Sequence, residues 1–297
     1  MDRTLKIAIQ GGPASFHETA AKELFASSGM QTMSCASFPE LCQALASGLA
    51  DYAVMAVQNS VAGPILSNYS LLAAHGFYVA AERWLFIDQT LMALPGQTMA
   101  DLKEIWSHPI ALLQCCDFVQ NSGLISKETA DTADTARQLK EEQISGVAAI
   151  ASRRAADLYG LEVLQGNVAN QPDNFTRFLV ISRQATSSAS DKATVLLPYP
   201  VVQFSLENVV EVLATSGVTL TMLQPLPAAH PGQPQAWVLE MESEQTADLT
   251  HALARLQGIS PNHQVLGLYK KAVSPLPKER LNGCLPTTLR TSTPELV

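Results

Sequence analysis

Residues 5–16 read Leu-Lys-Ile-Ala-Ile-Gln-Gly-Gly-Pro-Ala-Ser-Phe. The segment 5–9 alternates as a half-buried strand does, and Gly11-Gly12-Pro13 ends it with residues typical of a tight turn. Ser15 stands three residues before Glu18, the spacing of a capping box, so we expect a helix to begin there. This stretch therefore predicts a strand, a turn and a helix in succession.

The same succession of elements returns further along the chain. A helix expected at 38–48 leads to the nearly continuous apolar run 52–57, which suits a buried strand of a parallel sheet. Residues 80–164 repeat this pattern, and 178–181 form another short apolar strand. Alternating strands and helices are typical of α/β proteins, so an α/β fold is predicted for this region.

A change of composition at 184–192 marks a polar linker without apolar periodicity. Beyond it, residues 193–271 predict strand, helix, strand, strand, helix and strand, which is the ferredoxin-like βαββαβ order. Residues 272–297 are rich in Pro, Thr and Ser and are expected to form a flexible tail. The six elements are expected at 193–197, 206–216, 219–224, 236–241, 244–257 and 264–269.

Composition argues against several classes of protein. The 297 residues include 27 acidic and 19 basic side chains, a net charge of −8, so no basic surface for nucleic acid is expected. No run of about 18 apolar residues occurs, so no membrane span is expected, and the first residues lack a signal-peptide pattern. The five scattered cysteines fit reduced thiols, so we expect a cytoplasmic protein.

Motifs for common cofactors are missing from the sequence. The chain has no GxGxxG, GxxxxGK[ST], HExxH or GxSxG motif. Its six histidines are dispersed without the spacing of metal ligands. We therefore expect neither a cofactor nor a metal ion.

Four polar clusters lie at predicted strand ends or helix starts, near where open α/β sheets bind ligands. The clusters at 10–16, 58–60 and 107–109 also fit plain turns and helix caps, and Pro64 is expected in the first turn of a helix. In the fourth, at 174–178, Arg177 fits either an ion pair with a neighbouring acid or a clamp on a substrate carboxylate.

Taken together and in this order, the clusters resemble the motifs of prephenate dehydratase over residues 5–270. Gln58 stands where that family usually has Glu, which removes a charge. The similar segments are 10–16 (the Gly-rich turn), 58–63 (Glu-Asn-Ser-x-x-Gly), 107–115 (Ser-His-Pro-x-Ala-Leu-x-Gln-Cys) and 174–178 (Asn-x-Thr-Arg-Phe).

The resemblance implies a catalytic region at 1–183, built as two lobes around a cleft and similar to periplasmic binding proteins. One lobe would comprise about 1–79 and 170–183, and the other about 80–169. It also implies that Thr176 is the catalytic residue. The side chains that it implies for substrate binding are Arg177, Asn59, Ser60, Ser15, Ser107 and Phe178.

The implied reaction converts prephenate to phenylpyruvate, in phenylalanine biosynthesis, as the substrate loses CO2 and its ring hydroxyl together. Prephenate carries two carboxylates, so the site needs hydrogen-bond donors and positive potential, which Arg177 and helix N-termini can supply. The Thr176 hydroxyl is too weak an acid to ionise at neutral pH, but it can donate a hydrogen bond to the departing oxygen.

By the same resemblance, residues 193–271 correspond to the family's ACT domain, which binds phenylalanine in relatives. An amino-acid effector site is therefore implied, but both of its motifs are altered. Phe204, Ser205 and Leu206 replace Gly-Ala-Leu, and Gln224-Pro225-Leu226-Pro227 replaces Glu-Ser-Arg-Pro.

Two other functions stay open. An enzyme of this fold could act on arogenate, in which an amino group replaces the side-chain keto group. A non-catalytic ligand-binding protein is also built from two lobes around a cleft; Thr176-Arg177 speaks against it, and Gln58 for it. ACT units have exposed sheet edges that tend to pair, so a homodimer or homotetramer is expected.

Overall fold

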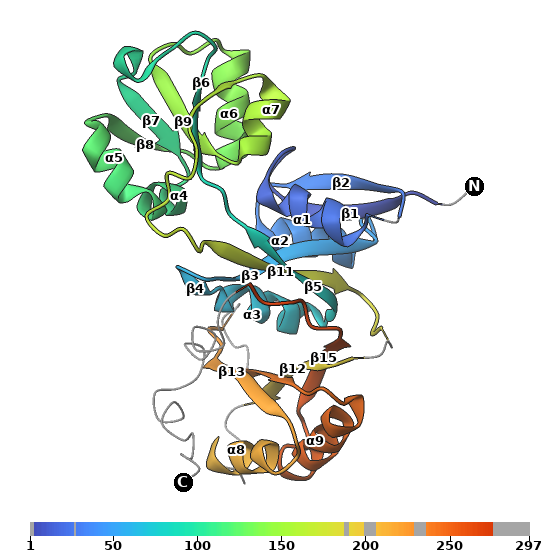
Figure 1. The fold of residues 1–297 in the computed structure, drawn as a ribbon. Coiled ribbons are helices and arrows are strands. Elements are labelled where there is room, and N and C mark those ends of the chain that lie inside the picture. The colour runs from blue at the N-terminus through green and yellow to red at the C-terminus, as the bar shows by residue number, and fades with distance from the viewer. Residues whose placement is uncertain (1–2, 27, 187–189, 199–205, 229–235, 276–297) are drawn as a thin grey trace, which may run out of the picture. The chain divides into compact units, whose positions relative to one another are not determined.

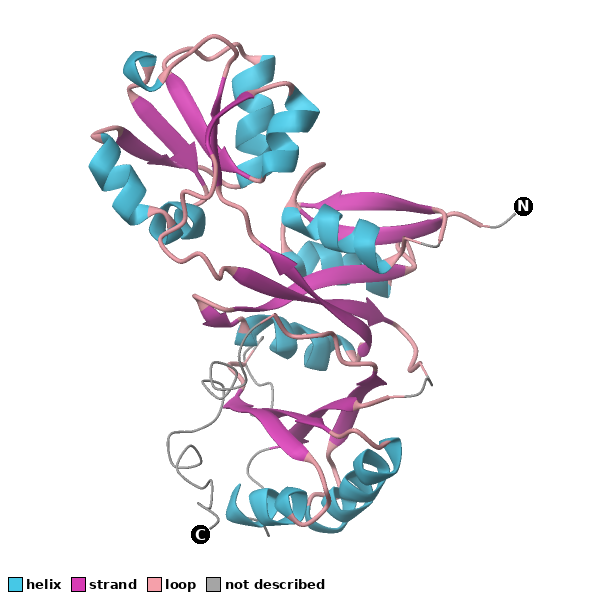
Figure 2. Cartoon of the chain, viewed as in Figure 1, coloured by secondary structure: helices cyan, strands magenta, loops and turns pink. Residues whose placement is uncertain are grey.

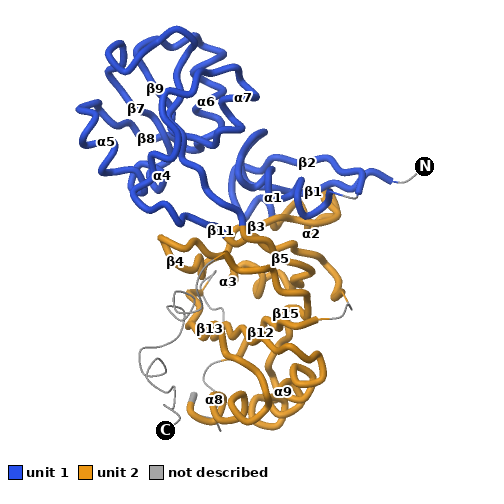
Figure 3. Tube along the Cα trace, in the orientation of Figure 1, with its two compact units in different colours: residues 1–41, 85–176 blue, residues 42–84, 177–297 orange. Residues whose placement is uncertain are grey.

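The computed structural model describes residues 3–26, 28–186, 190–198, 206–228 and 236–275 (Figure 1). Most of the predicted tail at 272–297 lies outside these residues. The chain divides into two compact units, one of residues 1–41 and 85–176 and one of residues 42–84 and 177–297 (Figure 3).

The fold is α/β, as predicted, and the residues that the structure describes form three sheets (Figure 2). The first sheet has the strand order β2-β1-β3-β11-β5, and the short β4 pairs with β3. Its strands are β1 (Leu5–Gln10), β2 (Met30–Cys35), β3 (Tyr52–Asn59), β4 (Gly63–Pro64), β5 (Tyr78–Phe86) and β11 (Phe175–Ser182). The helices between them are α1 (Phe16–Leu24), α2 (Phe38–Ala46) and α3 (Leu66–His75).

The second sheet lies within residues 85–176 and has the order β10-β6-β9-β7-β8. One face packs Met92 and Ala149 against Ala136, and the other packs Leu91 and Ile150 into a second core. The strands are β6 (Thr90–Ala93), β7 (Glu104–Ser107), β8 (Ile125–Glu128), β9 (Val147–Ala151) and β10 (Glu162–Gln165). The helices are α4 (Pro109–Gln114), α5 (Cys116–Ser122), α6 (Thr132–Glu141) and α7 (Arg153–Tyr159), with a 3-10 turn at Met99–Asp101.

The third sheet, with its helices, is called here the C-terminal sheet domain (residues 192–269). Its antiparallel strands have the order β13-β14-β12-β15, and the predicted βαββαβ succession is present. Val195 and Leu239 of the sheet pack with Val209 and Leu249 of the two helices. The elements are β12 (Lys192–Pro198), α8 (Leu206–Ala214), β13 (Thr219–Pro225), β14 (Ala236–Glu242), α9 (Thr246–Ile259) and β15 (Gln264–Tyr269).

Gly267 in β15 lies directly against Val79 in β5. A Cβ atom at Gly267 would lie 2.9 Å from the Cβ of Val79, and closer still to its carbonyl oxygen. Only a glycine allows two backbones to approach this closely. The C-terminal sheet domain therefore packs tightly against residues 42–84 of its own unit.

Replacing Gly267 with alanine is expected to lower the free energy of unfolding by about 1–3 kcal/mol, because the new methyl group displaces the Val79 backbone. Thermal unfolding followed by circular dichroism measures the loss. Gly258→Ala in α9 is the control, since in the described part of the chain a Cβ atom added there would meet no heavy atom within 4 Å beyond its chain neighbours and its own helix backbone. Equal melting temperatures for the two variants would show that the close packing at Val79 is absent in solution.

No helix of the described residues combines the length and the apolar character that crossing a bilayer requires.

Candidate active site

The Gly-rich turn after β1 is held in an unusual backbone conformation. Gly11 has a φ of +81°, and Ala14 has a φ of +64°, a region that residues with a side chain rarely adopt. Ser15 caps α1 as predicted: its Oγ accepts a hydrogen bond from the backbone N–H of Glu18 at 3.1 Å. The Glu18 carboxylate accepts from the N–H of Ala14 at 2.9 Å, one residue before the position expected for a capping box.

Side chains from α7 and its cap hold the carbonyl groups of this turn. Ser152 donates from its Oγ to the carbonyl oxygen of Ala14 at 2.8 Å, and the Tyr159 hydroxyl donates to that of Pro13 at 3.1 Å. A strained φ persists where the surroundings over-determine it, and such turns concentrate at functional sites. The Gly-rich turn is thus a rigid backbone feature beside Ser15, as a binding role for this cluster would require.

The end of β3 forms a tight hairpin with β4. Asn59 accepts at its Oδ1 from the backbone N–H groups of Val61 and Ala62, at 3.0 and 2.8 Å. Gln58 is buried and pairs with Pro64 across the hairpin. The expectation that Pro64 starts a helix is wrong, because it lies in β4 and α3 begins at Leu66.

The Ser107–Pro109 segment acts mainly as local structure. Ser107 is fully buried at the end of β7, where its Oγ donates to the carbonyl oxygen of Ile150 at 2.6 Å. His108 caps α4: its Nδ1 accepts a hydrogen bond from the backbone N–H of Ile110, and the two nitrogen atoms are 3.2 Å apart. Pro109 occupies the first helical position. These contacts favour the capping interpretation for the segment over direct binding by Ser107.

Three amide side chains, two of them buried, form a cluster next to β11. Gln114 accepts at its Oε1 from Gln89 Nε2 at 3.2 Å and from Asn174 Nδ2 at 3.1 Å. The Oε1 of Gln89 is itself buried and has no hydrogen-bond partner among the described residues. Asn174 directly precedes β11 and is 1% exposed, so the cluster anchors the entrance of this strand. Sequence reasoning did not single out Gln89; its polar side chain between the apolar stretches was the available signal.

β11 carries Thr176 and Arg177 next to each other. Successive side chains of a strand point to opposite faces, so Thr176 and Phe178 share one face while Arg177 occupies the other. Thr176 is 9% exposed, and Phe178 is almost fully buried. Ser15, Ser107 and Thr176 belong to the unit of residues 1–41 and 85–176; Asn59, Ser60, Arg177 and Phe178 belong to the other unit.

Arg177 lies in a buried ionic cluster, defined here as Arg177, Lys192, Glu82, Glu240 and Tyr69. The Nη1 atom of Arg177 donates to Glu82 at 2.9 Å and to Glu240 at 2.7 Å, and Nη2 donates to Tyr69 and to Glu240 at 2.7 and 3.0 Å. Lys192 Nζ lies 3.1 Å from Glu82 and 3.5 Å from Glu240. This geometry favours the ion-pair interpretation for Arg177 over a clamp on substrate.

The charges within the cluster shift its proton equilibria strongly. Burial alone would raise the pKa of Glu240, but the cationic Arg177 and Lys192 outweigh it and lower that pKa from 4.5 to about 2. Burial likewise opposes the charge of Arg177, whose pKa is nevertheless raised by Glu240. Glu240, Arg177 and Lys192 are therefore charged at neutral pH, whereas burial raises the pKa of Tyr69 and keeps its hydroxyl protonated.

The stability of the protein should fall in acid because of Glu240. Its pKa is lower in the folded chain than in an unfolded one, so its contribution is complete above about pH 4.5 and is lost as pH falls toward 2. The lost contribution is roughly 3 kcal/mol. Urea unfolding at pH 7, 4.5 and 3 should show a shallower pH dependence for Glu240→Gln than for the wild type. Identical slopes would contradict the ionised cluster.

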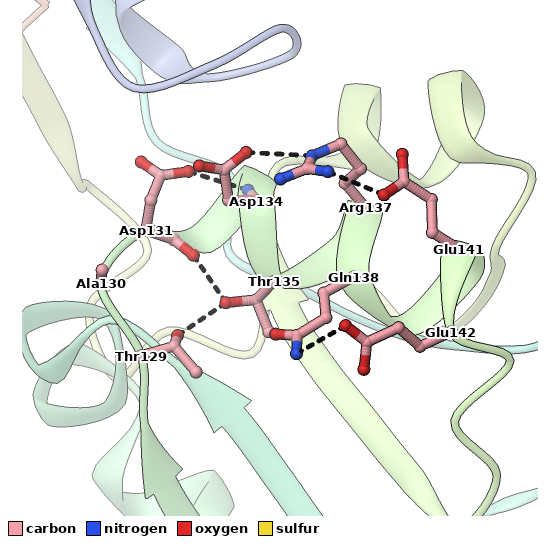
Figure 4. A pocket seen from close by; sticks show the side chains of 9 residues that line it. All are labelled: Thr129, Ala130, Asp131, Asp134, Thr135, Arg137, Gln138, Glu141 and Glu142. Carbon is pink, nitrogen blue, oxygen red and sulfur yellow. Dashed lines mark hydrogen bonds and ion pairs between the residues drawn. The ribbon is translucent and has the colours of Figure 1, made fainter. Parts of the chain in front are cut away.

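A hollow of about 220 Å³ lies along α6, between Thr129 and Glu142 (Figure 4). Among the residues that line it, Arg137 forms ion pairs along α6 with Asp134 at 3.3 Å and with Glu141 at 2.7 Å. It contains none of the residues that the sequence analysis assigned to the site.

The residues predicted for an effector site are only partly described. Phe204 and Ser205 lie outside the described residues, and Leu206 is the first residue of α8. Gln224 lies in β13, and Leu226 follows that strand with a buried side chain. The backbone N–H of Leu226 donates to Ala236 at 2.8 Å, so this end of β13 is held by β14.

A model of the family described as prephenate dehydratase matches residues 7–186, which include all four sequence clusters. The chain belongs to the prephenate dehydratase family. This match covers both the Gly-rich turn and the Asn-x-Thr-Arg-Phe strand, whose geometry is described above.

Similar proteins carry related names. The chain is 36% identical over 208 residues to an Arabidopsis thaliana arogenate dehydratase/prephenate dehydratase; this covers 70% of the chain but 51% of the plant protein, so it spans about half of that relative. It is 30% identical over 268 residues to a Komagataeibacter europaeus bifunctional N-acyl-homoserine lactone acylase/prephenate dehydratase, covering 89% and 95% of the two chains. A prephenate dehydratase structure from Arthrobacter aurescens, in complex with L-Phe, has a TM-score of 0.79 at 26% identity and covers 90% of each chain.

Proposed function

We propose that this chain catalyses the dehydration of prephenate with loss of CO2. The ring carboxylate leaves as CO2, the electrons of that bond complete the aromatic ring, and the ring hydroxyl departs and is protonated to water. Aromatisation drives the step, so the protein has only to hold the substrate and assist the leaving oxygen.

Thr176 carries the proposal. It lies in the strand that matches the family signature, and the amide cluster of Gln89, Gln114 and Asn174 anchors the start of this strand. In the proposed mechanism its hydroxyl donates a hydrogen bond to the departing oxygen. The other side chains proposed for substrate binding are Ser15 next to the Gly-rich turn, Asn59, Ser60 and Phe178.

Arogenate is the second candidate substrate, because an Arabidopsis thaliana relative is named for both activities and a Petunia hybrida relative is named arogenate dehydratase alone. Purified protein should be incubated with prephenate and with arogenate in parallel, with phenylpyruvate and phenylalanine measured as the products. Phenylpyruvate from prephenate is the expected result. If phenylalanine forms from arogenate and no product forms from prephenate, arogenate is the substrate. If neither compound is converted, the protein is a non-catalytic ligand-binding protein.

For the whole chain, we propose two catalytic lobes within 1–183 and an ACT domain at 193–271, in a cytoplasmic homodimer or homotetramer. The βαββαβ order of the C-terminal sheet domain supports the ACT assignment. Among the described strands of this sheet, β13 and β15 lie at the edges, and an edge strand can pair with that of a second copy of the chain.

Phenylalanine is expected to bind the ACT domain weakly or not at all. By resemblance, Phe204 fills the place of a glycine that admits the ligand, and Leu226 replaces a charged Arg. Each lost hydrogen bond costs about 0.5–1.5 kcal/mol, and up to about 3 kcal/mol where a charge is involved, so the affinity falls by orders of magnitude.

Calorimetric titration with phenylalanine, paired with an activity assay, tests this expectation. The variant Phe204→Gly/Leu226→Arg serves as the comparison, since it restores the usual residues at both positions. Saturable micromolar binding with inhibition in the wild type would show that the two substitutions do not abolish the site.

A further inference from the structure

The buried ionic cluster joins the C-terminal sheet domain to the strand that carries Thr176. Arg177 lies in β11 and Glu82 in β5, whereas Glu240 and Lys192 lie in β14 and β12 of the C-terminal sheet domain. All of these residues belong to the unit of residues 42–84 and 177–297. The ionic cluster therefore lies within one compact unit.

Glu240 forms a bidentate hydrogen-bonded ion pair with Arg177. Its two oxygens accept from Nη1 and Nη2 of Arg177 at 2.7 and 3.0 Å, which is a two-pronged arrangement that fixes the plane of the guanidinium. The Tyr69 hydroxyl donates to Glu240 at 2.7 Å and accepts from Arg177, so it closes a ring of three side chains. Arg177 and Glu240 are 1% and 2% exposed, so water cannot replace these bonds.

Thr176 is the residue before Arg177 in β11, on the opposite face of the strand. A twist or shift of β11 at Arg177 therefore moves the Thr176 hydroxyl, and a displacement of about 1 Å at a reacting group can lower a rate by about 100-fold. The fork of Glu240 resists both motions, because each lengthens one of its two bonds to Arg177.

We infer that Glu240, a residue of the C-terminal sheet domain, is a positioning residue for the dehydration step: it holds Arg177, and through Arg177 the strand that presents Thr176. The inference rests on the proposed function of Thr176. It makes the C-terminal sheet domain part of the catalytic machinery, and any ligand that moves β14 would act on Thr176 through this contact.

The test compares Glu240→Gln with Glu242→Gln. Glu242 lies two residues further along β14, where its side chain is 25% exposed; among the described residues it forms ion pairs with Lys192 and Lys271 but not with Arg177. Glu240→Gln is expected to lower kcat per folded molecule about tenfold with KM within twofold of the wild type. Glu242→Gln should leave both constants within about twofold.

Tyr69→Phe provides a second test of the inference in case Glu240→Gln does not fold. It removes one hydroxyl from the ring and leaves both charges paired, and kcat should fall about threefold. A wild-type kcat per folded molecule in Glu240→Gln, or in Tyr69→Phe if the first variant does not fold, would overturn the inference, since a merely structural role lowers only the amount of folded protein.

Hydrogen exchange separates this inference from the proposed function. The backbone amides of β11 should exchange about tenfold faster in Glu240→Gln than in Glu242→Gln. If the wild type turns over neither prephenate nor arogenate, the proposed function fails, and exchange still decides whether Glu240 holds β11. Equal exchange in the two variants would overturn the positioning role, whatever the enzyme's substrate.

Discussion

Replacement of Thr176 by alanine is expected to lower kcat by about two to three orders of magnitude, the usual cost of losing one hydrogen-bond donor that acts in the transition state. Thr176 is 9% exposed and small, so the change leaves only a minor cavity, and folding should survive. Steady-state kinetics with prephenate, with the folded fraction measured by circular dichroism, gives the effect per folded molecule.

Two further variants serve as controls for Thr176→Ala. Thr176→Ser keeps a hydroxyl and should retain most of the activity, which a role in packing alone does not predict. Thr135→Ala removes another buried threonine hydroxyl, which bonds within α6 and its cap at 2.6 Å, and should alter stability with little change in kcat. Near-wild-type turnover in Thr176→Ala would exclude the proposed catalytic role.

Arg177→Met should cause the largest loss of stability, about 3–5 kcal/mol, since it leaves the buried carboxylates of Glu82 and Glu240 short of their cation. The melting temperature should fall by roughly 10 °C. Arg137→Met is the control, because Arg137 also pairs with two carboxylates but on an exposed helix face, at 42% side-chain exposure. That variant should lose at most about 1 kcal/mol.

Kinetics of Arg177→Lys then separate the roles of this arginine. Lysine keeps the charge but cannot donate to Glu82, Glu240 and Tyr69 in one plane. A clamp on the substrate carboxylate would raise KM, whereas a positioning role lowers kcat and leaves KM near its wild-type value. A melting temperature equal to that of the wild type would contradict the buried cluster.

Local sequence signals placed the elements well where the interactions are short-range. The cap at Ser15 uses an N–H three residues away, and the apolar run at 52–57 became the buried β3. Pro64 was the exception. Its fixed φ suits a first helical turn and also the end of a hairpin, and the N–H of Ile65 bonds back to Val57 at 2.8 Å, which favours the hairpin.

By itself, the sequence determined the α/β order of elements, the βαββαβ succession of the C-terminal part and the family, because periodicity and short motifs are written in neighbouring residues. The role of Arg177 was open between an ion pair and a substrate clamp. Only the tertiary structure decided its partners, because Glu82 and Glu240 lie 95 and 63 residues away along the chain. Which carboxylate reaches a buried guanidinium depends on how strands from two sheets pack together, and no local pattern records that packing.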